Sequence, residues 1–216
     1  MPNEPPSYRT LSGSALSELL IERSRFWGLV APCDSEEAAR ALIAAQRKAY
    51  PGTRHTCSAF IVDPAQRLSR SSDDGEPAGT AGRPMLAVLE GAGLVNVCAC
   101  VSRYFGGILL GTGGLVRAYS GAVAAALKEA DLIERHWAWD QALTVPYSLW
   151  GGLQNLFSKE AGLYHGVQAD YADRVRLRFD VTAPDFPRAK KLLEDALQQA
   201  VHLTKTFGRY IDVPTV

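Results

Sequence analysis

The amino-acid sequence predicts an α+β protein with two domains. Its 216 residues are enough for one large or two small domains, and 47% of them are hydrophobic. The second half shows a complete β-α-β-β-α-β order, whereas the first half alternates strands and helices around a long polar segment at 63–83. We therefore expect a flexible tail at 1–7, a first domain at 8–135 and a second domain at 137–216.

Charge and cysteine content narrow the class of protein. Lys+Arg and Asp+Glu both number 23, so the formal net charge is zero, whereas dedicated nucleic-acid binders usually carry a basic excess. Cys33, Cys57, Cys98 and Cys100 form no C-x-x-C pair, which indicates reduced thiols. The polar N-terminus lacks signal-peptide features, and no apolar stretch reaches the length of a membrane span. We expect a cytoplasmic protein that does not associate with membranes.

In the first half, hydrophobic periodicity and start and stop residues define the elements. Residues 26–30 suit a strand that Pro32 closes, and Asp34 is expected to cap a helix that Pro51-Gly52 ends, with Glu37 completing a capping box. The later elements are a strand at 56–62, a loop at 63–83, a short helix at 84–89, a buried strand at 95–101 and a helix with its apolar face from Leu115 to Ala130. Gly121 interrupts that helix, so we expect close packing against a sheet there.

The second half of the sequence shows a more regular succession of strands and helices. We expect strands at 141–145, 164–170, 174–181 and 201–207, a helix at 148–161 and a helix that Asp185 opens. This is the order of the ferredoxin-like split βαβ motif. The strand at 174–181 alternates, with Arg174, Arg176, Arg178 and Asp180 outside. Nearby aspartates offset the arginine stripe, so a solvated face is favoured over an RNA contact.

A glycine-rich segment is the first candidate site. Arg103 to Gly107 ends a buried strand, and Gly111 to Gly114 opens a helix. Glycines there allow backbone N–H groups to point at one anion, and the N-terminus of a helix attracts anions. Alternatively, the glycines only permit a tight turn. The spacing fits neither a P-loop nor a dinucleotide fingerprint. The candidate phosphate- or RNA-binding residues are Arg83, Arg103, Gly106, Gly107, Gly111, Thr112, Gly113, Gly114 and Arg117.

An acidic loop is the second candidate. Asp73, Asp74 and Glu76 could hold a hydrated Mg²⁺ facing a phosphate. One loop supplies few ligands, so we favour a turn at Asp74-Gly75 with the other carboxylates in water.

The remaining reactive residues give weak signals. Cys98 and Cys100 share one strand face, as do His55 and Cys57, and two such pairs could meet as a zinc site, but cysteines buried as small hydrophobic residues are more common. The sequence shows no triad and no Gly-x-Ser-x-Gly elbow. We therefore expect no catalytic residues, no metal and no cofactor.

Two long blocks of sequence carry a resemblance to a known family. Residues 72–84 (SDDGEPAGTAGRP) and 103–117 (RYFGGILLGTGGLVR) resemble the signature blocks of the IMPACT family, including its bacterial YigZ-type members. Arg54 to Cys57 and Ser24 to Phe26 also match. The resemblance covers residues from about 18 to 131, while the second half is similar in shape to a C-terminal domain of translation elongation factor G.

The resemblance implies a first domain with the ribosomal-protein-like (second domain type) α+β sandwich. That superfamily also contains RNA-processing enzymes and small-molecule kinases. Eukaryotic members of the family regulate translation by competing for the activator of an amino-acid-starvation kinase. They carry an additional N-terminal partner-binding domain, which we do not expect in this chain.

Together these signals favour a non-enzymatic regulatory protein linked to translation or stress response. We expect it to bind RNA, a ribosome-associated protein or another phosphate-bearing ligand through Arg103 to Gly114. One alternative is an enzyme acting on a phosphorylated small molecule. A second is a protein-interaction module without a phosphate ligand.

Overall fold

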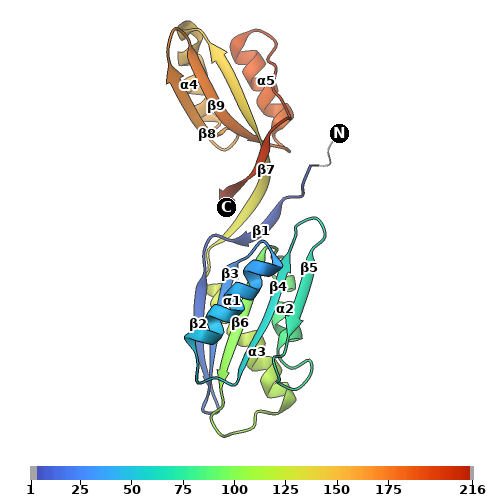
Figure 1. Cartoon of the computed structure of the whole chain (residues 1–216). Helices are drawn as coiled ribbons and strands as arrows, with labels where there is room; N and C mark the ends of the chain where they lie inside the picture. Colours follow the sequence, from blue (N-terminus) through green and yellow to red (C-terminus); the bar gives the residue numbers. More distant parts are fainter. Residues whose placement is uncertain (1–3, 215–216) are drawn as a thin grey trace. The chain divides into compact units, whose positions relative to one another are not determined.

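The computed structural model describes residues 4–214 and divides the chain into two compact units. The first unit comprises residues 7–134 and, of the described C-terminal residues, 213 and 214, and the second comprises residues 135–212 together with the N-terminal residues up to Pro6 (Figure 1). Of the expected tail, residues 1–3 lie outside the described residues. The part that is described makes contacts within the second unit: Glu4 pairs with Lys205 at 2.7 Å, and the Tyr210 hydroxyl donates to the Pro6 carbonyl at 3.0 Å.

The first unit is built on one antiparallel sheet. Its strand order is β2 (Ala15–Ile21), β3 (Ser24–Pro32), β6 (Val97–Tyr104), β4 (His55–Val62) and β5 (Leu68–Ser72). The central strand β6 is buried from Val97 to Arg103, as its continuous apolar run predicts. The edge strand β5 lies inside the segment where we expected only a loop. Its polar sequence, Leu-Ser-Arg-Ser-Ser, gives no apolar alternation because most of the strand is exposed.

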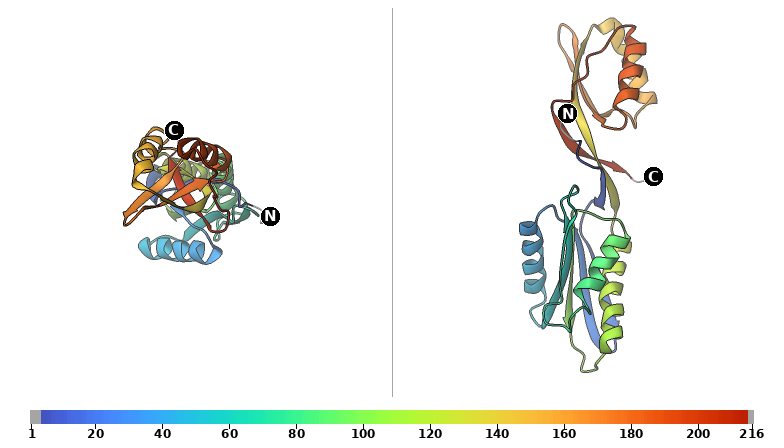
Figure 2. Two further views of the ribbon diagram at one scale, coloured as in Figure 1. Left: turned by 90° about the horizontal axis from the view of Figure 1, so that it is seen from above. Right: turned by 90° about the vertical axis from the view of Figure 1, so that its right-hand side faces the viewer.

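Helices cover both faces of this sheet. α1 (Glu36–Ala49) packs on one face, and α2 (Gly82–Gly91) and α3 (Gly111–Lys128) pack on the other (Figure 2). The expected helix cap at Asp34 is wrong by one residue, because Ser35 is the N-cap and its side chain accepts from the Ala38 N–H at 3.2 Å.

α3 packs tightly against the sheet at a strand glycine, Gly28. A Cβ on Gly28 would lie 2.9 Å from the Ala122 carbonyl oxygen, and the Ser17 hydroxyl donates to that oxygen at 2.8 Å. A Cβ on Gly121 would meet Leu19 at an ordinary 3.7 Å. Our explanation for Gly121 is therefore wrong, since the glycine that this packing requires is Gly28.

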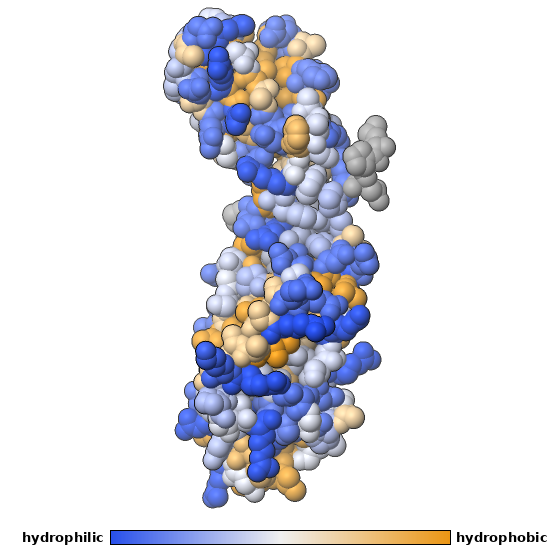
Figure 3. Space-filling model, in the orientation of Figure 1, coloured by the Kyte–Doolittle hydropathy of each residue, from blue (hydrophilic) through white to orange (hydrophobic). Residues whose placement is uncertain are grey.

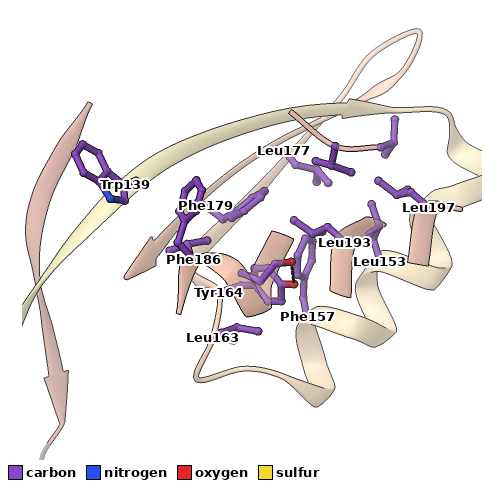
Figure 4. Close-up of a cluster of buried hydrophobic side chains, with 14 of the residues drawn as sticks. Trp139, Leu153, Phe157, Leu163, Tyr164, Leu177, Phe179, Phe186, Leu193 and Leu197 are labelled. Carbon is purple, nitrogen blue, oxygen red and sulfur yellow. Dashed lines mark hydrogen bonds between the residues drawn. The ribbon is translucent and has the colours of Figure 1, made fainter. Parts of the chain in front are cut away.

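The second unit has the ferredoxin-like strand order. β10 (Gly208–Pro214), β7 (Leu132–Val145), β9 (Val175–Thr182) and β8 (His165–Tyr171) are neighbours in that order. β1 (Tyr8–Leu11), which belongs to the first unit, also pairs with β7. α4 (Tyr147–Lys159) and α5 (Phe186–Leu197) supply the rest of the core. Figure 4 shows this cluster, which includes Leu153, Phe157, Tyr164, Leu177, Phe179, Leu193 and Leu197. The α+β fold class is thus confirmed, and no helix within residues 4–214 is long and apolar enough to cross a membrane.

Two strands of this unit differ from the prediction. β7 begins at Leu132 rather than residue 141, so it runs through the expected boundary between residues 135 and 137. The last strand is Gly208–Pro214, and the prediction of a strand at 201–207 is wrong. The buried side-chain amide of Gln141 donates to the Thr204 carbonyl at 2.7 Å and accepts from its N–H at 2.9 Å. A side chain therefore satisfies backbone groups that a strand ladder would otherwise pair.

Candidate nucleic-acid interface

The two motif segments meet at one end of the first-unit sheet. We call residues 73–80 the acidic loop and residues 104–117 the glycine-rich segment. Arg103, at the end of β6, stands opposite Phe26 on β3 and His55 on β4. The antiparallel register therefore brings segments far apart in sequence to the same end of the sheet.

Asp73 is a backbone cap rather than a free carboxylate. Its oxygens accept from the N–H groups of Gly79 at 2.8 Å, Ala81 at 2.9 Å and Gly82 at 2.8 Å, where α2 begins. Partial burial opposes ionisation, but these three hydrogen bonds outweigh it and lower the pKa of Asp73. A Cβ on Gly82 would lie 2.7 Å from the Ser72 nitrogen, so glycine is needed for α2 to start here.

Asp74 forms the tight turn of the acidic loop. Its φ is +44° and that of Gly75 is +88°, the pattern of a type I′ turn. One carboxylate oxygen accepts from Arg47 Nη2 at 2.8 Å and the other from the Thr56 N–H at 2.7 Å. The turn is as we expected, but the carboxylate is engaged by the fold.

Glu76 forms a buried ion pair with Arg103. The Arg103 Nη1 donates to both carboxylate oxygens, at 2.8 and 3.1 Å, and the Tyr119 hydroxyl donates to one of them at 2.7 Å. The side chains of Arg103 and Glu76 are only 8% and 4% exposed. The guanidinium also lies 5.5 Å from the ring centre of Phe26 and 5.4 Å from that of Phe105. The expectation that Glu76 faces water is therefore wrong, and Arg103 is part of the core.

The three carboxylates of the acidic loop do not converge. Asp73 caps α2, Asp74 holds Arg47 and Thr56, and Glu76 holds Arg103. Within the described part of the chain, no three His, Cys, Asp or Glu side chains come close enough to hold a metal ion. Nothing in this arrangement supports the Mg²⁺ alternative.

All four cysteine thiols are buried. Burial raises the pKa of Cys57 to about 12 and that of Cys33 to about 11. The hydrogen bond to Cys100, together with burial, raises the pKa of Cys98. Cys57 donates to the Asp73 carbonyl, whereas Cys98 and Cys100 pack in the α1-facing core, so the two pairs do not meet as a zinc site. None of these three thiols has the lowered pKa of a nucleophile.

Several glycines of the glycine-rich segment have structural roles. A Cβ on Gly106 would overlap the backbone of Arg23, and the Gly106 N–H donates to the buried Ser24 hydroxyl at 3.2 Å. Gly107 and Gly111 have φ of +86° and +69°, which favours glycine. The alternative of a steric turn therefore accounts for these three positions.

The start of α3 is different, because its backbone donors lack a side-chain cap. Among the described residues, no side chain hydrogen-bonds at the N-cap Leu110, and the first turn contains no acidic residue. Gly111 to Gly113 are exposed. A Cβ on Gly113 would meet only Arg117 Nη1, at 3.6 Å, so this exposed guanidinium lies beside the first turn. The open donors, the helix dipole and the arginine together favour an anion.

Large exposed apolar side chains lie in the segment that precedes this helix. Tyr104 is 52% exposed, Phe105 39% and Leu109 86%, and Figure 3 shows apolar surface at this end of the first unit. Sequence reasoning did not assign these three residues to the site. The sequence did contain a signal for them: large apolar residues in a glycine-rich loop lie outside the core and are left exposed to solvent. Arg83 is exposed in the first turn of α2.

Comparisons with known proteins agree on one family. The Impact N-terminal domain model matches residues 22–127. The IMPACT family member YigZ of Escherichia coli is 39% identical over 186 residues, covering 85% of this chain and 90% of that protein. The IMPACT family member YvyE of Bacillus subtilis is 38% identical over 149 residues, covering 69% of each.

Two solved structures resemble this chain to different degrees. A crystal structure described only as that of a hypothetical protein is 34% identical with a TM-score of 0.61, over 93% of this chain and 97% of that one. The structure of the two-domain translational regulator Yih1 is 24% identical with a TM-score of 0.32, over 58% and 49% of the chains. The second likeness is too weak to transfer a function.

Proposed function

Because the chain belongs to the IMPACT family, whose eukaryotic members regulate translation, we propose that it is a non-enzymatic, translation-linked regulator that binds single-stranded RNA. The observation that carries this proposal is the open N-terminus of α3. Its first turn is exposed, contains no acid and has Arg117 beside it.

Phosphate oxygens fit this helix end. They accept from the first-turn N–H groups, and the missing side chain at Gly113 lets a phosphate approach the backbone closely. Arg117 adds a charge-assisted contact. The exposed rings of Tyr104 and Phe105 offer faces on which unstacked bases can lie. This combination suits a single strand rather than a duplex.

The zero net charge limits the number of phosphate contacts. We expect RNA affinity to fall with salt with a shallow slope, equivalent to about two to four neutralised phosphates. Arg103 is excluded from these contacts, because Glu76 already holds its guanidinium.

The test is a salt titration of binding to a short single-stranded RNA. Arg117→Ala should lower the slope by about one unit, as loss of one phosphate contact does. Arg40→Ala is the matched control, because Arg40 is an exposed arginine on α1. Equal slopes for the two variants would contradict the proposal.

Two other functions remain as outcomes of the same assay. An enzyme acting on a phosphorylated small molecule needs a general base, and the acidic-loop carboxylates are engaged by the fold. Tight ATP binding with turnover would favour that enzyme. The exposed Leu109 fits a protein-interaction module, which would replace our proposal if neither RNA nor ATP binds.

A further inference from the structure

The second unit carries a hollow on the outer face of its sheet. The core with α4 and α5 lies on the inner face, which holds Leu177 and Phe179. On the opposite side, a hollow of about 320 Å³ is lined chiefly by Asp140, Gln168, Arg178, Asp180, Phe207 and Arg209. It adjoins a second hollow along β8 and β9 that shares Gln168 and Arg178.

Asp180 is the unusual residue of this hollow. The strand pattern places it on the outer face, opposite Asp140 on β7 and His165 on β8, yet its side chain is only 5% exposed. Its Oδ2 accepts from Arg209 Nη2 at 2.7 Å. Its Oδ1 is buried and has no hydrogen-bond partner within residues 4–214. A buried carboxylate oxygen that accepts no hydrogen bond costs folding free energy, so a ligand that carries an N–H or O–H group would be stabilised by donating to this atom.

Arg209 covers this carboxylate from the solvent side. Its own side chain is 70% exposed, so it can turn outward without disturbing the core. That movement would open Asp180 to the hollow. Burial makes a carboxylate selective, because a ligand that lacks the donor leaves it unpaired.

The other lining residues define the rest of the ligand. Phe207 is 74% exposed and presents an aromatic ring at the rim. Arg178 is exposed two residues before Asp180, on the same face of β9. The hollow therefore combines a buried acceptor, an aromatic surface and a cation, which match the amine, the ring and the phosphate of a nucleotide.

We propose that this hollow binds a nucleotide whose base carries an exocyclic amino group. The amine donates to Asp180, the base stacks on Phe207, and the phosphate meets Arg178. The nucleotide is either free or part of an RNA strand, since both present the same groups. This site lies in the second unit and is independent of RNA binding at α3.

The test compares cytidine monophosphate, which carries an exocyclic amine, with uridine monophosphate, which carries a carbonyl oxygen at the same position. Calorimetric titration of the full chain should show binding at least about tenfold weaker for the uridine nucleotide. Asp180→Asn should lose or invert this preference, because an amide can donate to the carbonyl. Phe207→Ala should weaken both nucleotides, and Arg174→Ala, in the bend just before β9 and outside the hollow, should change neither.

The source of the nucleotide is resolved with hexamers of cytidylate and uridylate, using a chain that carries Arg117→Ala. A cytidylate hexamer that binds at least tenfold more tightly than the monophosphate identifies an RNA strand, and equal affinity identifies a free nucleotide. The proposal is overturned if cytidine and uridine ligands bind equally or not at all. It is also overturned if a folded Asp180→Asn variant, verified by its thermal transition, keeps the cytidine preference.

Discussion

The acidic loop and the glycine-rich segment look equally functional in the sequence, but the structure separates them. In the acidic loop, the carboxylates of Asp73, Asp74 and Glu76 all have partners inside the chain. In the glycine-rich segment, the first turn of α3 keeps exposed donors without a side-chain cap. Polar groups that already have partners inside the chain stabilise the fold around a site. A ligand binds where hydrogen-bonding groups remain open.

The largest effect should come from breaking the buried ion pair. Arg103→Met leaves the Glu76 carboxylate buried without its cation, which should destabilise the first unit by about 3 to 5 kcal/mol. Urea unfolding at neutral pH measures this change. Arg25→Met breaks the exposed pair with Glu18 and should stay within about 1 kcal/mol. Similar losses for the two variants would mean that the acidic loop is not held as we describe.

The glycines allow a second contrast, within the glycine-rich segment itself. Gly106→Ala forces a methyl group into the Arg23 backbone and should lower the unfolding free energy by about 1 to 3 kcal/mol. Gly113→Ala meets only the end of Arg117 and should leave stability unchanged or raise it by up to about 1 kcal/mol. Thermal unfolding compares the two variants. Equal destabilisation would show that the start of α3 is as tightly packed as the loop.

Asp73 should give a smaller, pH-dependent effect. Asp73→Asn removes the charge and one of the two acceptor oxygens that cap α2, and it should reduce stability at pH 7 by about 0.5 to 1.5 kcal/mol, the usual net contribution of one hydrogen bond. The folded pKa lies below its ordinary value, so ionised Asp73 stabilises the fold above about pH 4, and this stabilisation is lost as pH falls through the folded pKa.

Chemical unfolding from pH 7 down to pH 2 follows this difference. The gap between wild type and Asp73→Asn should close in acid, and Mg²⁺ should leave both melting temperatures unchanged. A gap that stays constant would contradict the role of ionised Asp73 as a cap, and a melting temperature that rises with Mg²⁺ only in the wild type would revive the metal interpretation.

Most of the fold could be predicted because its core elements repeat apolar residues at strand or helix spacing. The buried run of β6 and the apolar face of α3 are examples. Prediction failed where the stabilising partner is distant in sequence or is not backbone. β5 is polar and gains its order from pairing with β4, and Thr204, inside the segment 201–207, is held by the Gln141 side chain.

The site was harder to predict for the same reason. Glu76 and Arg103 are both charged residues in motif segments, and nothing local distinguishes a ligand contact from an internal ion pair. Their pairing depends on a fold that joins residues 27 positions apart. By contrast, the open start of α3 follows from local sequence, since the glycines and the absence of acid are visible there.

The substitution Thr112→Glu tests whether the start of α3 binds RNA phosphate. Thr112 is exposed in the first turn, where a glutamate should stabilise the helix by about 0.3 to 1 kcal/mol through the dipole. The same negative charge should repel phosphate. We predict that Thr112→Glu melts no lower than wild type yet binds a short single-stranded RNA at least about tenfold more weakly at low salt. Thr112→Gln, of similar shape but neutral, should bind like wild type. Equal RNA affinity for the Glu and Gln variants would show that the start of α3 does not bind RNA phosphate.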